Sequence, residues 1–287
     1  MTVVSGRRRI ARDVLRHRGA SIGLLLVAAF VALSALSPWL SPHGPFEQDL
    51  SAAFRPPWHL PGGTADHLLG TDGLGRDILS RILHGARYSL QIGVVSVGIA
   101  ALFGVFLGAI AGFFPATDNA IMRVMDVMLA FPSILLAIVI VATLGPGLIN
   151  AMIAVGIVAI PQYARLVRGS VLTVRVREYV AASAALGASD LRVLSRTVMP
   201  NCLSPLIVQC TMGFATAILD AAGLSFLGLG ARPPTPEWGA LLHEGFQDFL
   251  SAWWVVTFPG VAVFLAVLGF NLLGDGLRDI LDPRASG

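Results

Sequence analysis

Residues 127–164 contain no Asp, Glu, Lys or Arg, and this uncharged stretch limits the folds open to the chain more than any other feature. A helix needs about 20 mostly apolar residues to cross a bilayer, so the stretch is too long for a single span. Gly145, Pro146 and Gly147 interrupt it, and such residues mark turns. The pattern predicts two antiparallel membrane spans joined at this turn.

The composition of the whole chain also indicates a membrane protein. Hydrophobic residues make up 55% of the 287 residues, charged residues make up only 13%, and the mean hydropathy is +0.75. A soluble fold would lack the polar surface that it needs. Apolar runs of spanning length predict six transmembrane helices, at roughly 20–40, 88–114, 124–144, 148–165, 203–229 and 253–273. We therefore expect an all-α polytopic membrane protein.

The positions of the arginines predict the orientation of these spans. Arginine-rich segments fall consistently on one side, whereas residues 41–86 and 231–252, on the other side, contain at least as many acidic residues as arginines. Basic residues mark the cytoplasmic side of a membrane protein, so both termini are expected in the cytoplasm. Residues 1–86 would then hold the N-terminus, the first span and an external segment, and residues 87–287 a five-helix core.

The external segment contains one loop that superficially resembles a phosphate-binding loop. It is glycine-rich at residues 70–77, but Arg76 and Asp77 stand where Lys and Ser or Thr are needed to reach phosphate and Mg²⁺. No nucleotide site is therefore expected in this chain. Directly after the loop, apolar residues recur at helical spacing over 78–84, with Arg81 off the apolar face, and predict a short helix lying on the membrane. This helix is either a plain interfacial helix or one that also contacts a partner protein.

Other kinds of site are disfavoured by the sequence. The six histidines all lie outside the expected spans, and none repeats at the i, i+4 spacing of helical zinc ligands, so no metal site is expected. Ser225 has no histidine within a span to activate it, which disfavours an intramembrane hydrolase and favours a packing role. The net charge of +3 gives no reason to expect a nucleic-acid partner.

Two acidic residues within the expected spans are candidates for function, because charge inside a membrane is costly. Asp126 lies three residues from Arg123, a spacing that allows a structural ion pair on one helical face, or a gate. Asp220 has no charged residue within eleven positions on either side. It either bonds to a neighbouring helix or subunit, or lines a pathway. Each of spans three to five contains a proline, whose freed carbonyl groups need protein or a watery cavity beside them, so these spans are expected to enclose that pathway.

Small residues recur every four positions along the second span, at Ala100, Gly104, Gly108 and Gly112. Such a ridge removes side chains from one face and lets another backbone approach closely. It predicts tight packing against a second helix and indicates architecture rather than chemistry.

An alanine-rich segment in the arginine-rich loop between spans four and five predicts a short helix over 178–186. Tyr179, Ala182 and Leu186 are spaced to share one face of it. Gly187 follows, at the position where helices often end in a left-handed residue. Ser189 is then expected to cap a second short helix that stops at Pro200. Two helices joined at a fixed bend make a rigid docking element.

The spacing within this loop resembles the "EAA" loop of ABC importer permeases. The family's glutamate and two alanines fall on Ala181, Ala182 and Ser183, its glycine on Gly187, and its terminal proline on Pro200. The glutamate is thus replaced by alanine and the second alanine by serine. The resemblance implies an ATPase-coupling loop at about 170–201, with the site residues Glu178, Tyr179, Ala181, Ala182, Ser183, Leu186, Gly187 and Pro200.

Further motifs resemble those of the second membrane subunit of dipeptide, oligopeptide and nickel permeases. They lie at 67–77, 122–132, 224–236 and 271–283, so that with the loop they extend over most of the chain. The resemblance implies a type I ABC importer permease fold (MetI-like) in the bacterial plasma membrane. It also implies a heterodimer with a homologous permease, two cytoplasmic ATPases that bind ATP and Mg²⁺, and an external solute-binding protein.

On this interpretation the chain itself catalyses nothing and holds no cofactor. Peptides are the expected substrate, with nickel complexes, glutathione or another small solute as alternatives. A secondary transporter is the competing class, but it would be expected to show inverted repeats or paired broken helices, and no convincing internal repeat is present.

Overall fold

The computed structural model of the chain describes residues 13–281, and the regular structure of that part is helical. The long helices are α2 (Arg18–Leu40), α3 (Ile78–Phe113), α6 (Leu148–Arg175), α9 (Leu203–Phe226) and α11 (Trp254–Leu281). The shorter elements are α4 (Pro115–Leu129), α5 (Ser133–Leu144), α7 (Glu178–Ala185), α8 (Asp190–Arg192), α10 (Trp238–Phe246), and the turns η1 (Leu50–Ala52), η2 (Val193–Val198) and η3 (Met199–Cys202). The expected all-helical fold is confirmed.

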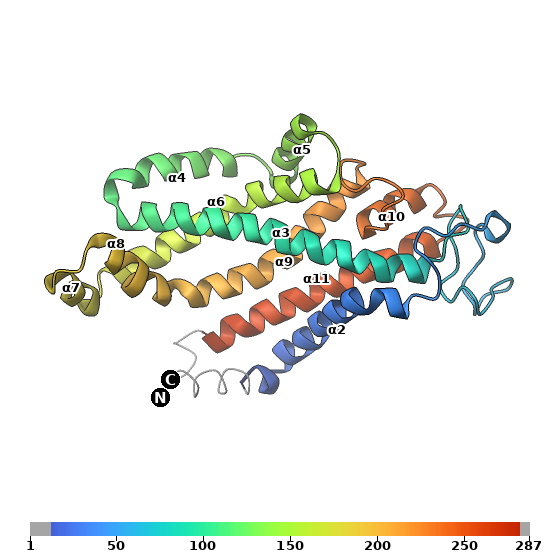
Figure 1. Cartoon of the computed structure of the whole chain (residues 1–287), viewed down its shortest axis with the longest axis horizontal. Helices are drawn as coiled ribbons and strands as arrows, with labels where there is room; N and C mark the ends of the chain where they lie inside the picture. Colours follow the sequence, from blue (N-terminus) through green and yellow to red (C-terminus); the bar gives the residue numbers. More distant parts are fainter. Residues whose placement is uncertain (1–12, 282–287) are drawn as a thin grey trace.

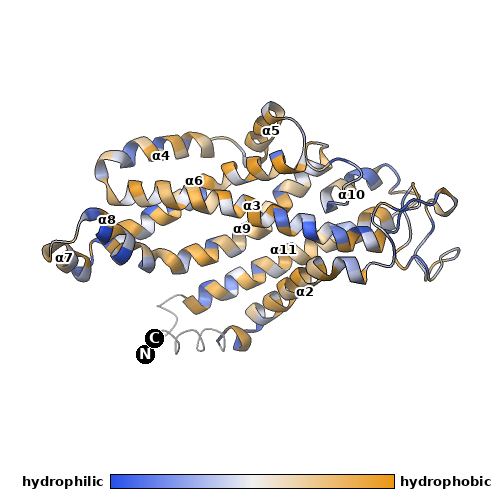
Figure 2. Ribbon diagram, in the orientation of Figure 1, coloured by the Kyte–Doolittle hydropathy of each residue, from blue (hydrophilic) through white to orange (hydrophobic). Residues whose placement is uncertain are grey.

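The long helices run lengthwise beside one another, with α7 and α8 at one end of the molecule and residues 41–77 at the opposite end (Figure 1). Figure 2 shows that hydrophobic residues dominate the helices between the two ends. Many large apolar side chains face outward, including Leu102, Phe106 and Phe264. A bundle with an apolar exterior is stable only in a lipid-like environment, so the helices form the membrane-embedded part of the protein.

Within residues 13–281, five helical stretches are long and apolar enough to cross a membrane, and a bent pair gives a sixth. The third span was expected as one helix over 124–144, and that expectation is wrong. The chain instead forms α4 and α5, which meet at an angle of 93°. Pro132 explains the break, because a proline disfavours helical geometry in the residue before it and cannot donate a backbone hydrogen bond.

The short helix expected on the membrane over 78–84 is also not a separate element. It is the first part of α3, which runs without a break from Ile78. The Asp77 side chain begins the helix by accepting a hydrogen bond from the Ser80 N–H at 2.8 Å. Arg81, which lies off the apolar face of this segment, is 1% exposed and forms ion pairs inside the protein.

The glycine ridge of α3 packs against α6, as the spacing predicted. A Cβ atom added at Gly104 would lie 2.4 Å from the Tyr163 Cβ, and one added at Gly108 would lie 2.4 Å from the Ala164 carbonyl oxygen. Real Cβ atoms do not approach other atoms so closely, so only glycine allows this helix spacing. The pair α3 and α6 therefore forms a closely packed centre for the bundle.

Candidate functional site

Helix α7 lies at one tip of the molecule (Figure 1). One of its faces is anchored and the other is exposed. Val180 is 5% exposed and packs in an apolar cluster with Val171 of α6 and Val193 of η2. On the opposite face Ala182 is exposed, Tyr179 is 48% exposed and Leu186 is 89% exposed. An anchored helix with an apolar outer face is suited to insertion into a partner.

The bend after α7 has the predicted left-handed glycine. Gly187 has a φ of +84°, and a Cβ added there would meet nothing within 4 Å. The N–H of Gly187 donates to the Ala184 carbonyl at 2.9 Å, and the N–H of Ala188 donates to the Ser183 carbonyl at 3.3 Å. These two bonds form the Schellman motif, which fixes the direction in which the chain leaves α7.

The expectations for the next helix are partly wrong. Ser189 occupies the N-cap position of α8, but its side chain makes no capping hydrogen bond. The helix also does not stop at Pro200, because α8, η2, η3 and α9 follow one another without a gap. Pro200 lies in the first turn of η3, where its missing N–H does little harm. The bend at Gly187 is therefore connected directly to a long membrane helix.

The remaining loop residues lie around α7. Glu178 stands in its first turn and is exposed, and Ala181 is exposed as well. Ser183 is half-buried and takes part in the bend through its carbonyl group.

Asp220 faces a cavity of about 180 Å³ inside the bundle. Residues of α3, α5, α6 and α9 line this cavity, and Gln162 and Thr216 contribute further polar groups. None of the ion pairs found within residues 13–281 includes Asp220. The carboxyl group is thus available to a molecule that enters the cavity.

Comparison with known proteins identifies the family. Residues 100–287 match the model of the "binding-protein-dependent transport system inner membrane component", and residues 6–57 match the "N-terminal TM domain of oligopeptide transport permease C". The chain belongs to this permease family.

Named relatives cover nearly the whole permease. It is 53% identical to the di/tripeptide transport system permease protein DppC of Pseudomonas aeruginosa, over 93% of this chain and 89% of the relative. It is 52% identical to the dipeptide transport system permease protein DppC of Escherichia coli, over 94% of this chain and 90% of the relative. A solved structure of the MetNI methionine ABC transporter in an inward-facing conformation shares the fold, with a TM-score of 0.58 and 18% identity over 71% of this chain and 97% of that chain.

Asp126 of the permease is paired, but its partner was predicted incorrectly. Its carboxylate accepts a hydrogen bond from Arg165 of α6 at 2.5 Å, rather than from Arg123 on its own helix. Nearby, Arg168 binds both carboxylate oxygens of Asp118, at 2.5 and 2.6 Å. Because both ion pairs join α4 to α6, they hold α4 beside the bundle. The i, i+3 spacing in the sequence could not reveal a partner on another helix.

Sequence reasoning missed a buried ion-pair network at the opposite end of the permease. Arg81 donates to Asp72 at 2.6 Å and to Glu244 of α10 at 3.0 Å, and Arg76 binds the same two carboxylates. The network fastens the glycine-rich loop to α3 and α10. The loop is therefore held rigidly in place, and its partner in α10 lies too far along the chain for a spacing signal.

Glu237, at the start of α10, was also missed. Its carboxylate accepts hydrogen bonds from the N–H groups of Gly239 and Ala240 at 2.9 and 3.0 Å. Burial raises the pKa of Glu237, and these bonds together with the Ser225 hydroxyl lower it only in part. The hydroxyl of Ser225 also accepts a hydrogen bond from the Ala231 N–H, in line with a packing role.

The expectation that the histidines form no metal site rests on their spacing along the sequence, which cannot detect ligands from distant segments. The fold brings His43, His67 and Asp77 together, with one ligand atom of each within 4.8 Å of the others. Its members lie far apart in the sequence and do not have the i, i+4 spacing of helical zinc ligands.

Proposed function

We propose that this permease is the translocation subunit of an ATP-driven importer of di- or oligopeptides. The observation that carries the proposal is the identity of about half of all residues, over nearly full length, with permeases named for dipeptide and di/tripeptide transport. Identity at this level over 93–94% of the chain supports a shared class of substrate.

The exposed face of α7 is the proposed contact with a cytoplasmic ATPase. Tyr179, Ala182 and Leu186 present a small apolar surface, while Val180 ties the helix to α6 and η2. Closure of two ATPases on ATP and Mg²⁺ would push α7 and, through the Gly187 bend, shift α8 and α9. Because α9 carries Asp220, movement of the loop would reach the cavity directly.

The orientation proposed from the arginines places α7 and both termini in the cytoplasm. Residues 41–77, at the other end of the molecule, would then face the external solute-binding protein. A homologous permease would complete the pathway as the second half of a heterodimer. ATP hydrolysis belongs to the ATPase subunits and not to this chain.

Asp220 is the proposed contact for the peptide. A peptide carries a terminal ammonium group, and an unpaired carboxyl group in a small cavity is suited to bind it. Polar residues beside it, Gln162 and Thr216, could accept or donate hydrogen bonds to the backbone of a peptide whose sequence varies.

The test is uptake of a labelled dipeptide by the complete transporter in proteoliposomes, with ATP hydrolysis measured in parallel. Ala182→Arg places a charge in the proposed ATPase contact and is expected to abolish stimulated hydrolysis and uptake, whereas Ala182→Ser is the matched control of similar size. Asp220→Asn is expected to reduce uptake while the ATPases remain bound. If Ala182→Arg complexes retain wild-type uptake, the coupling role of α7 is wrong.

A further inference from the structure

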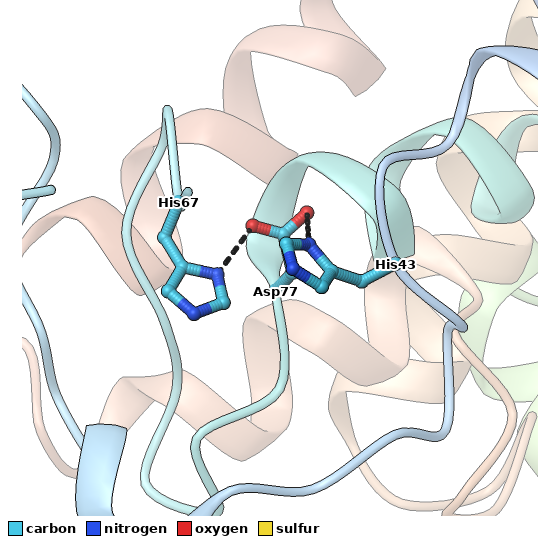
Figure 3. A group of neighbouring side chains, drawn as sticks. All are labelled: His43, His67 and Asp77. Carbon is cyan, nitrogen blue, oxygen red and sulfur yellow. Dashed lines mark hydrogen bonds and ion pairs between the residues drawn. The ribbon is translucent and has the colours of Figure 1, made fainter. Parts of the chain in front are cut away.

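Three chain segments that are distant in the sequence meet at the end of the molecule opposite α7. His43 follows α2, His67 lies in the middle of the external segment, and Asp77 caps the start of α3. Figure 3 shows both imidazole rings beside the Asp77 carboxylate, with His67 directed at one oxygen and His43 at the other. The Nδ1 atom of His67 lies 3.1 Å from one carboxylate oxygen, and the Nδ1 atom of His43 lies 4.0 Å from the other.

These distances fit a shared metal ion. Zn²⁺ binds imidazole nitrogen and carboxylate oxygen at about 2.0–2.2 Å in a tetrahedron, which places the donor atoms roughly 3.4 Å apart. The observed separations of 3.1 and 4.0 Å bracket this value. The two rings are stacked, with centroids 4.7 Å apart and planes 29° apart, so both nitrogens approach the carboxylate from one region.

The Nδ1 atom of His43 provides a second, independent observation. It is closed off from solvent, yet it has no hydrogen-bond partner within the described residues. Leaving a buried polar atom unpaired destabilises the folded state. A cation between the three side chains would satisfy this nitrogen, which the carboxylate at 4.0 Å does not.

Ser80 supplies the outer contacts that metal ligands usually have. Its N–H and its hydroxyl donate to Oδ2 of Asp77 at 2.8 and 2.6 Å, and its hydroxyl accepts a hydrogen bond from the backbone N–H of His43 at 3.1 Å. One carboxylate oxygen is thus held in place while Oδ1 faces His67. Hydrogen-bonded carboxylate ligands of this kind are typical of metal sites.

We propose that His43, His67 and Asp77 bind one divalent transition-metal ion, of which Zn²⁺ is the clearest example. Two neutral imidazoles and one carboxylate are a donor set that zinc favours. Three protein donors leave one position of a tetrahedral site for a water molecule. The ion fastens both halves of the external segment to the start of α3. This site is independent of the transported substrate.

The test uses the purified full-length permease after treatment with a chelator. Titration with Co²⁺ is expected to give the visible absorption of a tetrahedral site at one ion per chain, and Zn²⁺ is expected to displace the Co²⁺ and to raise the unfolding temperature. His43→Gln and His67→Gln are each expected to weaken binding at least about 100-fold, and Ser80→Ala about 10- to 100-fold. His59→Gln changes an exposed histidine of the same segment and is the matched control, with unchanged binding.

The wild-type spectrum decides the proposal even if a variant does not fold. Absence of a one-equivalent Co²⁺ spectrum in folded wild-type protein would overturn it. So would equal binding by His59→Gln, His43→Gln and wild type. A third outcome also overturns it. If the unfolding temperature does not change with Zn²⁺ but falls as the pH rises through the histidine range, the three residues form an ion pair between a protonated histidine and the aspartate.

Discussion

Gly108 offers the sharpest test of the packing between α3 and α6. A Cβ atom at this position would lie 2.4 Å from the Ala164 carbonyl oxygen, 3.0 Å from the Ala164 Cα and 3.0 Å from the Val167 Cβ. Ordinary contact begins at 3.4 Å, so the two backbones would have to separate by about 1 Å. Because the nearest atom belongs to the backbone, no change of rotamer can relieve the contact.

The expected cost of Gly108→Ala is about 1–3 kcal/mol of overpacking, offset by about 1 kcal/mol of helix propensity that alanine gains over glycine. Gly98→Ala isolates the second effect, because a Cβ at Gly98 of the same helix meets nothing within 4 Å. We therefore expect Gly108→Ala to be less stable than Gly98→Ala by about 1–3 kcal/mol, or roughly 5- to 150-fold in the unfolding equilibrium constant.

The assay is reversible unfolding of the purified permease in mixed micelles, followed by tryptophan fluorescence. Gly108→Leu should be less stable still. Adding Ala164→Gly should not rescue Gly108→Ala, because the contact is with a carbonyl oxygen that both residues carry. Equal stabilisation by Gly108→Ala and Gly98→Ala would refute the close approach of these helices.

Three further predictions concern the loop, α10 and the topology. Gly187→Val is expected to lose ATPase coupling, whereas Gly187→Asn is expected to keep most of it. The space around Gly187 is open, so the variants differ only in how well they adopt the left-handed backbone, which costs most residues other than Gly and Asn about 1–2 kcal/mol. Equal uptake by both variants in proteoliposomes would contradict a role for the bend. Because the pKa of Glu237 is raised, the folded protein holds the carboxyl proton more tightly than the unfolded chain does. The stability advantage of wild type over Glu237→Gln should therefore fall as the pH rises from about 4.5 through the pKa of the folded state. In unfolding experiments, an advantage that grows with pH would show that folding lowers the pKa instead. Cysteines placed at the exposed positions Ala65 and Ser251 should react with an impermeant thiol reagent added outside intact cells, whereas a cysteine at the exposed position Ala185 should not. Labelling at Ala185 would reverse the proposed orientation.

Features that depend on local or periodic signals can be predicted from the amino-acid sequence alone. Apolar runs located the membrane helices because each must supply its own length of hydrophobic surface. The four-residue repeat through Gly108 identified a packing face, since every fourth residue of a helix lies on one side. Gly187 marked the bend because only glycine adopts a left-handed conformation at no steric cost.

Contacts between residues that are distant in the sequence, by contrast, become known only from the fold. The partner of Asp126 is on α6, the partners of Arg81 include Glu244 of α10, and His43 joins His67 across a loop. The 93° angle between α4 and α5 likewise depends on what those helices pack against, although Pro132 marks where the break occurs. Side chains pair according to the positions that helix packing gives them, and spacing along the chain carries no record of contacts between residues so far apart.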